Sequence, residues 1–464
     1  MKKSIPTTVL LSSCVVLFAA RSSPAQNWPQ FLGQNREARA TFAAPKSWPK
    51  EVTPKWKISV GDGVATPSLE GDKLYVFTRQ EGGEVLRCLD AASGKEIWKS
   101  EKYDVLPANG PAQGFTGPRS SPTVADGKVV TLGLRGTLSC YDAAKGTLLW
   151  RKEDFKGSLP RFFTSASPLM VDGLCIAALG GGEQGGVIAY QLASGEEKWR
   201  WTGDGPSYAS PVVMTVDGTK LVIVEMDKRI LGLSLKDGKA LWETPFVVQG
   251  RGYNASTPVV DGSTLIYGGS GRGFTAVKLT KEGDAITAKE LWKNTDNSVQ
   301  FNTPVLKDGT LYALTANNDV VCLGKDGKTA WSTPFSPAAA APANPPPAAT
   351  TGEPGGTNAQ PAARGPDGGP GREGRRGGPG GPGGRGGGGG GGGRVGYGQM
   401  VDAGTVMLAL TPFSELIAFQ PSEKAYTELA RLKVADSPTY AFPVVSGKRI
   451  FVKDQDSVAL FTLD

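Results

Sequence analysis

The 464-residue sequence predicts an all-β fold: an eight-bladed β-propeller of four-stranded antiparallel blades, closed by an N-terminal strand. Three observations lead to this prediction. A strand pattern recurs eight times, most copies end in tryptophan, and the last copy lacks one strand while an unmatched strand precedes the first. A repeat of about 44 residues is the size of one propeller blade, and such a sheet must stack on its neighbours because it cannot bury both faces alone.

The first half of each copy is a short hairpin. It opens with a small or hydroxyl residue, a proline and an apolar strand, and a turn glycine follows. The opening prolines are Pro67, Pro122, Pro168, Pro211, Pro258, Pro304 and Pro443, and the glycines are Gly71, Gly127, Gly173, Gly218, Gly262, Gly309 and Gly447. Asp-Gly between apolar runs indicates a tight hairpin because its turn requires positive φ. A further copy at 400–404 has no proline.

The second half of each copy runs from a small residue through a glycine turn to a tryptophan. Cys88 and Trp98 illustrate the usual spacing of ten residues, and the copy at 276–292 carries a six-residue insertion. We expect each tryptophan to pack beside a small residue of an adjacent sheet and so dock one blade on the next. The residues with this predicted role are Trp56, Trp98, Trp150, Trp199, Trp242, Trp292 and Trp331.

Trp56 belongs to the strand that should close the ring. The last copy ends at Asp464 without its tryptophan strand, whereas residues 54–58 precede the first copy and belong to no other. An N-terminal strand that completes the last sheet removes two free sheet edges, which are otherwise prone to association.

The first 25 residues have the features of an export signal. Lys2 and Lys3 form a basic start, residues 9–20 an apolar stretch, and residues 23–25 a small-residue cleavage site. The apolar stretch is too short to span a bilayer, and its continuation past Cys14 makes a lipid anchor there the weaker alternative. We expect an exported monomer, in the periplasm or at the cell surface or secreted, that does not span the membrane.

The rest of the chain divides by composition. Residues 26–52 form an N-terminal arm, residues 53–335 the closing strand and blades 1–6, and residues 399–464 blades 7 and 8. Residues 336–398 are rich in Pro and Ala and then in Gly and Arg, so we expect a disordered insertion. Much of the basic excess lies in this segment, and no nucleic-acid partner is expected.

The sequence contains no histidine and five cysteines. The missing histidine excludes Ser-His-Asp and Cys-His nucleophiles and histidine zinc sites. Cys88, Cys140 and Cys322 occupy one position in separate copies, too far apart for a disulfide, and are expected to be buried free thiols. We assign no catalytic residue and no metal ligand.

The run Leu89–Trp98 and its echoes resemble the PQQ-type β-propeller repeat, and the resemblance covers residues 53–335 and 399–464. It implies either a dehydrogenase with PQQ and calcium at the ring axis or an exported, non-catalytic propeller, similar to the outer-membrane assembly factor BamB, that binds protein partners. The leader Trp28–Gly33 resembles the arm of exported PQQ-like proteins. No adjacent Cys-Cys pair and no calcium-ligand set of the dehydrogenase kind is found, which favours the BamB-like type without a cofactor.

A binding site is predicted where loops enter the opening strands. Tyr208, Phe301 and Tyr440 each lie three residues before their proline and should share one ring at the mouth of the channel, where Tyr397 is also expected. Aromatic and arginine side chains dominate binding energy at interfaces. The alternative is that these side chains only plug the mouth. The candidate residues are Arg119, Arg161, Phe163, Tyr208, Arg251, Tyr253, Asn254, Phe301 and Tyr440.

These observations predict a binding scaffold for a protein or cell-envelope partner. The alternative is a PQQ- and calcium-dependent alcohol or sugar dehydrogenase, and a weaker one is a carbohydrate-binding propeller. Glu225 and Asp227 resemble a carboxylate pair, but Lys228 and Arg229 follow them directly, so a solvated hairpin turn is expected.

Overall fold

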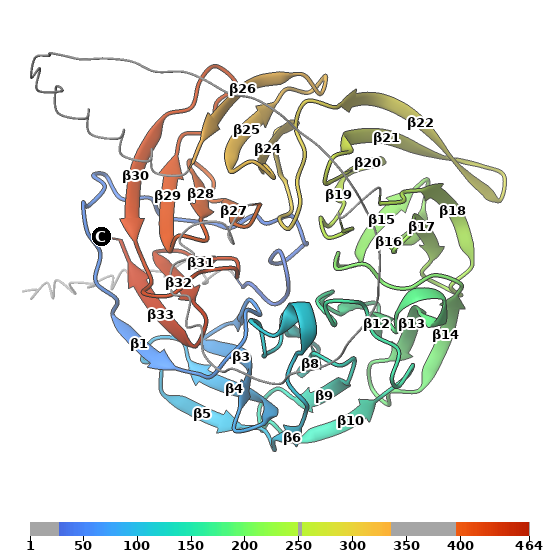
Figure 1. Cartoon of the computed structure of the whole chain (residues 1–464), viewed down its shortest axis with the longest axis horizontal. Helices are drawn as coiled ribbons and strands as arrows, with labels where there is room; N and C mark the ends of the chain where they lie inside the picture. Colours follow the sequence, from blue (N-terminus) through green and yellow to red (C-terminus); the bar gives the residue numbers. More distant parts are fainter. Residues whose placement is uncertain (1–26, 249–252, 336–395, 464) are drawn as a thin grey trace, which may run out of the picture. The chain divides into compact units, whose positions relative to one another are not determined.

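The computed structural model describes residues 27–248, 253–335 and 396–463. These residues form eight antiparallel sheets arranged around a common centre, which confirms the predicted eight-bladed β-propeller (Figure 1). Seven sheets follow one another in sequence, and the eighth combines the first strand with the last three.

The first four blades are built from consecutive strands, and blade 1 carries a short fifth strand. Blade 1 is β2 (Ser68–Glu70), β3 (Lys73–Gln80), β4 (Gly83–Asp90), β5 (Glu96–Lys99) and β6 (Tyr103–Asp104); blade 2 is β7 (Thr123–Ala125), β8 (Lys128–Leu132), β9 (Leu138–Asp142) and β10 (Leu148–Lys152). Blade 3 is β11 (Leu169–Val171), β12 (Leu174–Leu179), β13 (Gly186–Gln191) and β14 (Glu197–Thr202); blade 4 is β15 (Val212–Val216), β16 (Thr219–Glu225), β17 (Arg229–Ser234) and β18 (Ala240–Pro245). Two 3₁₀ turns, η1 (Gly110–Ala112) and η2 (Gly182–Gln184), lie in loops.

The second four blades repeat this order. Blade 5 is β19 (Val259–Asp261), β20 (Thr264–Gly269), β21 (Gly273–Glu282) and β22 (Ala285–Asn294); blade 6 is β23 (Val305–Lys307), β24 (Thr310–Leu314), β25 (Asp319–Leu323) and β26 (Thr329–Pro334). Blade 7 is β27 (Gln399–Asp402), β28 (Met407–Leu410), β29 (Glu415–Phe419) and β30 (Glu428–Lys433); blade 8 is β31 (Val444–Ser446), β32 (Arg449–Lys453), β33 (Ser457–Thr462) and the closing strand β1 (Trp56–Ser59).

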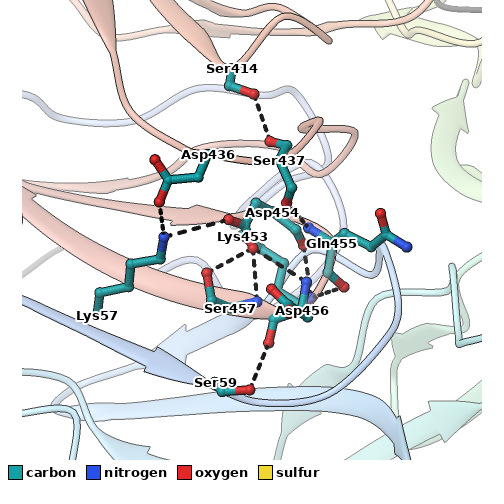
Figure 2. Close-up of polar contacts among 10 residues, drawn as sticks. All are labelled: Lys57, Ser59, Ser414, Asp436, Ser437, Lys453, Asp454, Gln455, Asp456 and Ser457. Carbon is teal, nitrogen blue, oxygen red and sulfur yellow. Dashed lines mark hydrogen bonds and ion pairs between the residues drawn. The ribbon is translucent and has the colours of Figure 1, made fainter. Parts of the chain in front are cut away.

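The closing strand lies where the sequence predicts it. β1 pairs antiparallel with β33, with Trp56 opposite Leu460, and so completes blade 8. Beside this pairing, the buried Lys453 donates hydrogen bonds to the carbonyls of Asp454 and Gln455 at 2.8 and 3.1 Å (Figure 2). It also donates to the carbonyl of Gly63 at 2.7 Å. Burial lowers the pKa of Lys453 to about 8. Its ammonium group therefore joins blade 8 to the chain that enters blade 1.

The tryptophans lie against glycine turns of the next blade. A Cβ atom on Gly146 would clash with Trp98 Cε3, and Gly146 has φ +73°. The Trp98 indole N–H donates to Ala143 O at 3.2 Å in the same turn. The same close approach joins Trp56 to Gly94, Trp150 to Gly195, Trp199 to Gly238 and Trp292 to Gly327.

The small residues before tryptophan do not lie opposite the tryptophan of an adjacent sheet, as expected, but opposite that of their own sheet. Cys88 is the direct cross-strand partner of Trp98 within blade 1, and the tryptophans of blades 2 to 6 have the same register. Opposite residues of an antiparallel pair project to the same face, so a small residue leaves room there for the indole ring. A bulge between Cys88 and Leu89 shifts the register beside this pair.

Three junctions depart from the glycine–tryptophan pattern, and blade 7 has no tryptophan on its last strand, where Ala430 stands opposite Ala418. The insertion in blade 5 extends the β21–β22 hairpin, and Trp242 packs there with Leu279 and Ile286. Trp331 of blade 6 donates its indole N–H to Ser422 O of blade 7 at 2.8 Å and packs on Tyr426. Aromatic packing thus replaces the glycine contact at this junction.

The N-terminal arm crosses the middle of the ring (Figure 1). Trp28 exchanges backbone hydrogen bonds with Leu69 of blade 1, and Ala38 and Ala40 do so with Asp402 of blade 7. Between these points the buried Arg36 guanidinium donates to the carbonyls of Pro168 and Pro211 in blades 3 and 4. The arm therefore links blades on different sides of the channel.

Some predicted segments lie outside the described residues: the export signal at 1–25 and residues 336–395 of the expected insertion. Gly396–Gly398, which the sequence analysis placed in that insertion, are instead among the described residues, and Tyr397 contributes to the site below. No helix within the described ranges is long and apolar enough to cross a membrane.

Candidate functional site

A cavity of about 250 Å³ lies where the loops enter the opening strands, and we call it the mouth cup. Its wall is mainly aromatic, with Arg119 as the charged lining residue. The aromatic lining residues are Phe31, Phe115, Phe162, Tyr208, Tyr253, Phe301, Tyr397, Tyr440 and Phe442. Phe31 belongs to the N-terminal arm and packs edge-on against Phe442 at 5.4 Å between ring centroids.

Hydroxyl groups next to the cup hold neighbouring blades together. The backbone N–H of Ser121 donates to Ser167 Oγ at 2.9 Å, that of Ser167 to Ser210 Oγ at 2.9 Å, and that of Ser210 to Thr257 Oγ1 at 3.0 Å. Thr257 continues the series to Thr303 at 3.3 Å. These residues stand directly before the opening prolines, which explains why the repeat favours Ser or Thr there. The relay fixes the bases of the mouth loops relative to one another.

Three aromatic rings from blades 3 to 5 form one side of the cup. Phe162 and Tyr253 meet edge-on at 4.8 Å between centroids, and Tyr208 and Tyr253 at 6.0 Å. The Phe162 backbone N–H donates to Tyr208 Oη at 3.0 Å. Edge-to-face packing holds these rings in fixed orientations.

A second aromatic group comes from blades 6 to 8 and the loop before blade 2. Phe301 stacks on Tyr397 at 4.4 Å, and Tyr397 meets Tyr440 edge-on at 5.1 Å. Phe115 meets Tyr440 at 5.3 Å. The predicted grouping of Tyr208, Phe301 and Tyr440 around one mouth agrees with this cavity.

Arg119 joins two mouth loops. Its guanidinium donates to Phe162 O at 2.6 Å and to Phe115 O at 3.0 Å. Burial lowers the pKa of this guanidinium. A cation in an aromatic wall gives the cup a preference for partners that carry an acceptor or negative charge beside apolar groups.

Three other predicted candidates lie outside the cup lining. Phe163 has φ +65° and turns into a buried cluster with Leu134. Arg161 is exposed and lies over the Phe162 ring at 5.6 Å. Asn254 is buried, and its amide donates to the carbonyls of Met226, Asp227 and Phe246. Arg251 lies outside the described residues.

Glu225 is not part of a solvated turn, contrary to the sequence-based expectation. Its side chain is 1% exposed, and neither carboxyl oxygen has a hydrogen-bond partner among the described residues. Burial raises the pKa of Glu225 well above its ordinary value, and the charge of Arg272 opposes this shift. Arg272 instead donates to Asn254 Oδ1 and Phe246 O. The prediction relied on the charged neighbours Lys228 and Arg229. However, Glu225 is the last residue of β16, and this strand is buried up to that residue.

The cup lining does not match a calcium–quinone site. Calcium takes six to eight oxygen ligands and favours carboxylates, whereas no Asp or Glu lines the cup. Within the described ranges no group of three or more acidic or cysteine side chains is placed to hold a metal ion. Cys88, Cys140, Cys175 and Cys322 are buried free thiols.

Sequence reasoning missed Phe31, Phe115 and Phe442 as lining residues. Phe442 stands directly before its opening proline, in the position of Ser121 and Ser210, so the repeat alignment could have revealed it. Phe31 lies in the non-repeating arm, and its contact with blade 8 is too distant in sequence for a local pattern to show.

The family model described as outer membrane protein assembly factor BamB matches residues 46–182 and 81–333. BamB of Xanthomonas campestris is 24% identical over 269 residues, which cover 54% of this chain and 62% of that protein. The matched segment thus spans less than two thirds of the relative's length.

Other relatives are quinoprotein dehydrogenases. The quinohemoprotein alcohol dehydrogenase of Comamonas testosteroni is 29% identical over 144 residues, covering 30% of this chain and 19% of the enzyme. Its crystal structure aligns with 96% of this chain and 81% of the solved chain at a TM-score of 0.59 and 14% identity. The crystal structure of BamB from Moraxella catarrhalis aligns with 89% of this chain and 98% of the solved chain, at a TM-score of 0.56 and 13% identity. At these identities the structural likeness shows the fold alone.

Proposed function

The chain belongs to the family of the outer membrane protein assembly factor BamB, and on this premise we propose that it is an exported, non-catalytic scaffold in outer membrane protein assembly. It binds a protein or cell-envelope partner through the mouth cup. It acts as a monomer in the periplasm or at the cell surface. PQQ, calcium and nucleic acid take no part in this function.

The observation that carries this proposal is the concave aromatic wall around Arg119. The rings are held by edge-to-face contacts, and Arg119 is tied to two loop carbonyls, so a partner meets a preorganised surface. Preorganisation lowers the entropy cost of binding, and buried aromatic and arginine residues provide most of the affinity at interfaces. The hydroxyl relay keeps the loop bases in place.

Site-specific photo-crosslinking in cells tests the proposal. A photoreactive amino acid replaces Tyr253 or Phe301 in the cup, and the matched control places it at Leu291, an exposed apolar residue of β22. We expect the two cup positions to give the same discrete adduct to an envelope protein and Leu291 to give none.

Substitution of the same region provides the second arm of the test. The double variant Tyr253→Ser and Phe301→Ser should lose the adduct formed from a reporter at Phe162, while the midpoint of thermal unfolding stays within about 3 °C of the unsubstituted chain. Leu291→Ser should keep the adduct. An adduct that persists in the double variant, or that forms equally from Leu291, rejects the cup as the partner site.

The dehydrogenase alternative rests on the sequence likeness over 144 residues. It requires a ligand set that the cup does not supply, since Arg119 is the charged residue of the lining. Reconstitution with PQQ and calcium, followed by dye reduction with alcohols or sugars, tests it directly. We expect no activity above that of PQQ alone. Binding on a glycan array that Tyr253→Ser abolishes would instead favour the carbohydrate-binding alternative.

A further inference from the structure

The N-terminal arm binds the ring by adding to the inner edges of the blades. Trp28 N donates to Leu69 O and Leu69 N to Trp28 O, both at 2.8 Å. Val124 N donates to Pro29 O at 2.8 Å, and Asp402 N donates to Ala38 O at 2.8 Å. Blades 1, 2 and 7 therefore use the channel-facing edge of their innermost strand to hold an extended segment.

The strand register explains why these backbone groups face the channel. Glu70 and Lys73 flank the two-residue turn of blade 1, and Leu69 pairs with Leu74 one step further. Along an antiparallel pair, residues alternate between exchanging both hydrogen bonds with the partner strand and directing both groups away from it. Leu69 belongs to the second kind, which leaves its N–H and C=O for the arm.

Blades 4, 5 and 6 have equivalent positions that the arm does not reach. Val260 pairs with Leu265 and Leu306 with Leu311, each one step from a two-residue turn, and Val213 lies three steps from its turn and has the same parity. Like Leu69 and Val124, all three stand two residues after the opening proline. Among described residues, none outside their own sheets makes a backbone hydrogen bond to them.

Side-chain burial separates the covered edges from the open ones. Leu69 and Val124 are buried beneath the arm, whereas Val213, Val260 and Leu306 are only half-buried. These three residues line a cavity of about 330 Å³. Asn35, Arg36, Glu37 and Arg39 of the arm line the same cavity. The open edges thus continue the surface on which the arm already lies.

We propose that an extended segment of a partner protein adds to the inner edges of β15, β19 and β23 in this cavity. The site lies among the inner strands and the arm, separate from the mouth-loop residues, and so goes beyond the function proposed above. Strand addition takes affinity from main-chain hydrogen bonds and specificity from alternate side chains. The segment alternates apolar with polar residues, as the arm does, and passes from one blade to the next about three residues apart, the spacing that separates the arm's bridges from Arg39 to Asp402 and from Phe42 to Gly447.

The arm shows which pattern such edges accept. Ala38, Ala40 and Phe42 are buried, while Glu37, Arg39 and Thr41 alternate with them on the exposed side. A peptide of residues 37–43, acetylated and amidated, is therefore a suitable probe for the full chain. The control peptide has the same side chains but carries N-methyl groups at alternate backbone nitrogens, which block strand pairing.

Amide hydrogen exchange measures the site directly. In the free protein, the amides of Val213, Val260 and Leu306 should exchange at least 100-fold faster than those of Leu69, Val124 and Asp402. The probe should slow exchange at the first three at least tenfold, and the N-methylated peptide should not. Equal protection of all six amides without the probe would overturn the proposal, because it would mean that the edges are not open.

Two variants test the site in different ways. Val260→Pro removes a backbone N–H that faces the channel and makes no hydrogen bond to β20. Leu306→Trp fills the cavity with a larger side chain and leaves the backbone hydrogen-bonding groups unchanged. Each should weaken probe binding at least tenfold, whereas Val247→Trp, at an exposed residue outside both cavities, should not. Unchanged affinity of Leu306→Trp for the probe would overturn the proposal. So would a probe that protects only amides of the mouth-cup loops or displaces the arm from Leu69. Dimerisation of the chain in place of probe binding would also overturn it.

Discussion

Single residues in this propeller differ sharply from their sequence neighbours. Phe162 lines the mouth cup, whereas the next residue, Phe163, has positive φ and points into a buried cluster. Glu225 is buried without a hydrogen-bond partner among the described residues, although Asp227, Lys228 and Arg229 follow it closely. Local composition therefore identifies the loops that matter but not which side chain of each loop reaches the cavity.

Replacement of Glu225 by glutamine should change how stability depends on pH. Burial raises the pKa of Glu225 in the folded chain, so its favourable contribution is complete below about pH 4.5 and is lost as pH rises toward the folded pKa. In urea unfolding between pH 4.5 and 8, we expect Glu225→Gln to reduce this loss and to raise the unfolding free energy at pH 7 by about 1–3 kcal/mol. Glu101→Gln, at an exposed residue, should leave the profile unchanged. A parallel shift of both variants would contradict the assignment.

At the scale of elements, the blades are joined by a repeated contact between tryptophan and glycine. Gly146 and Gly127 are both turn glycines with φ near +70°, but a Cβ on Gly146 would strike Trp98 while one on Gly127 would meet open space. Comparing substitutions at Gly127 and Gly146 therefore separates two costs of adding a Cβ atom. One is the strain of a left-handed backbone, and the other is the disturbed packing of the tryptophan.

Alanine at these two glycines should give different losses of stability. Gly127→Ala should lower the unfolding free energy by about 1–2 kcal/mol, the cost of a left-handed conformation for a residue with a Cβ atom. Gly146→Ala should lower it by about 2–4 kcal/mol, because the Trp98 ring must move as well. Denaturant unfolding of both variants measures the difference. Equal losses would mean that the tryptophan contact adds nothing at this junction.

The junction at the closing strand β1 is stabilised by the side chain of Lys453, which lies on β32 and not on the paired strands β1 and β33. Lys453 satisfies three carbonyls at the junction between blade 8 and blade 1, and Figure 2 shows those of Asp454 and Gln455. Lys453→Met keeps much of the apolar stem but removes these hydrogen bonds, so we expect the unfolding free energy to fall by about 2–4 kcal/mol. Lys198→Met, at an exposed residue of β14, is the matched control and should cost less than about 0.5 kcal/mol. Differential scanning calorimetry distinguishes the two outcomes.

At the scale of the whole molecule, the arm ties separate blades together across the channel. Arg36 reaches the carbonyls of Pro168 and Pro211, whereas Arg39 of the same arm has a side chain that is 52% exposed. Arg36→Met should therefore lower the unfolding free energy by about 2–4 kcal/mol and Arg39→Met by at most about 1 kcal/mol. Chemical denaturation of the two variants checks this ordering. A larger loss for Arg39→Met would show that the ion pair with Asp402 dominates the anchoring of the arm.

The repeats made the ring predictable from sequence. Regular spacing of the opening prolines and turn glycines predicted eight sheets, and the missing last strand predicted that Trp56 pairs with blade 8. The position of the small residues was wrong, because a bulge beside Cys88 places them opposite tryptophan in the same sheet. The path of the arm could not be predicted, since Phe31 and Arg36 meet blades far away in sequence without any repeat to mark them. Tyr208, Phe301 and Tyr440 could be placed at the mouth from sequence because they share a repeat position, and all three line the mouth cup.

Closure by the first strand also sets a timetable for biosynthesis. Trp56 leaves the ribosome roughly 400 residues before its partner Leu460, so the earliest strand made must wait for the latest one. Until then the chain has two unpaired edge strands, which can pair with strands of other polypeptides. Chaperone demand of the exported chain should consequently last until the final hairpin is available, rather than declining blade by blade.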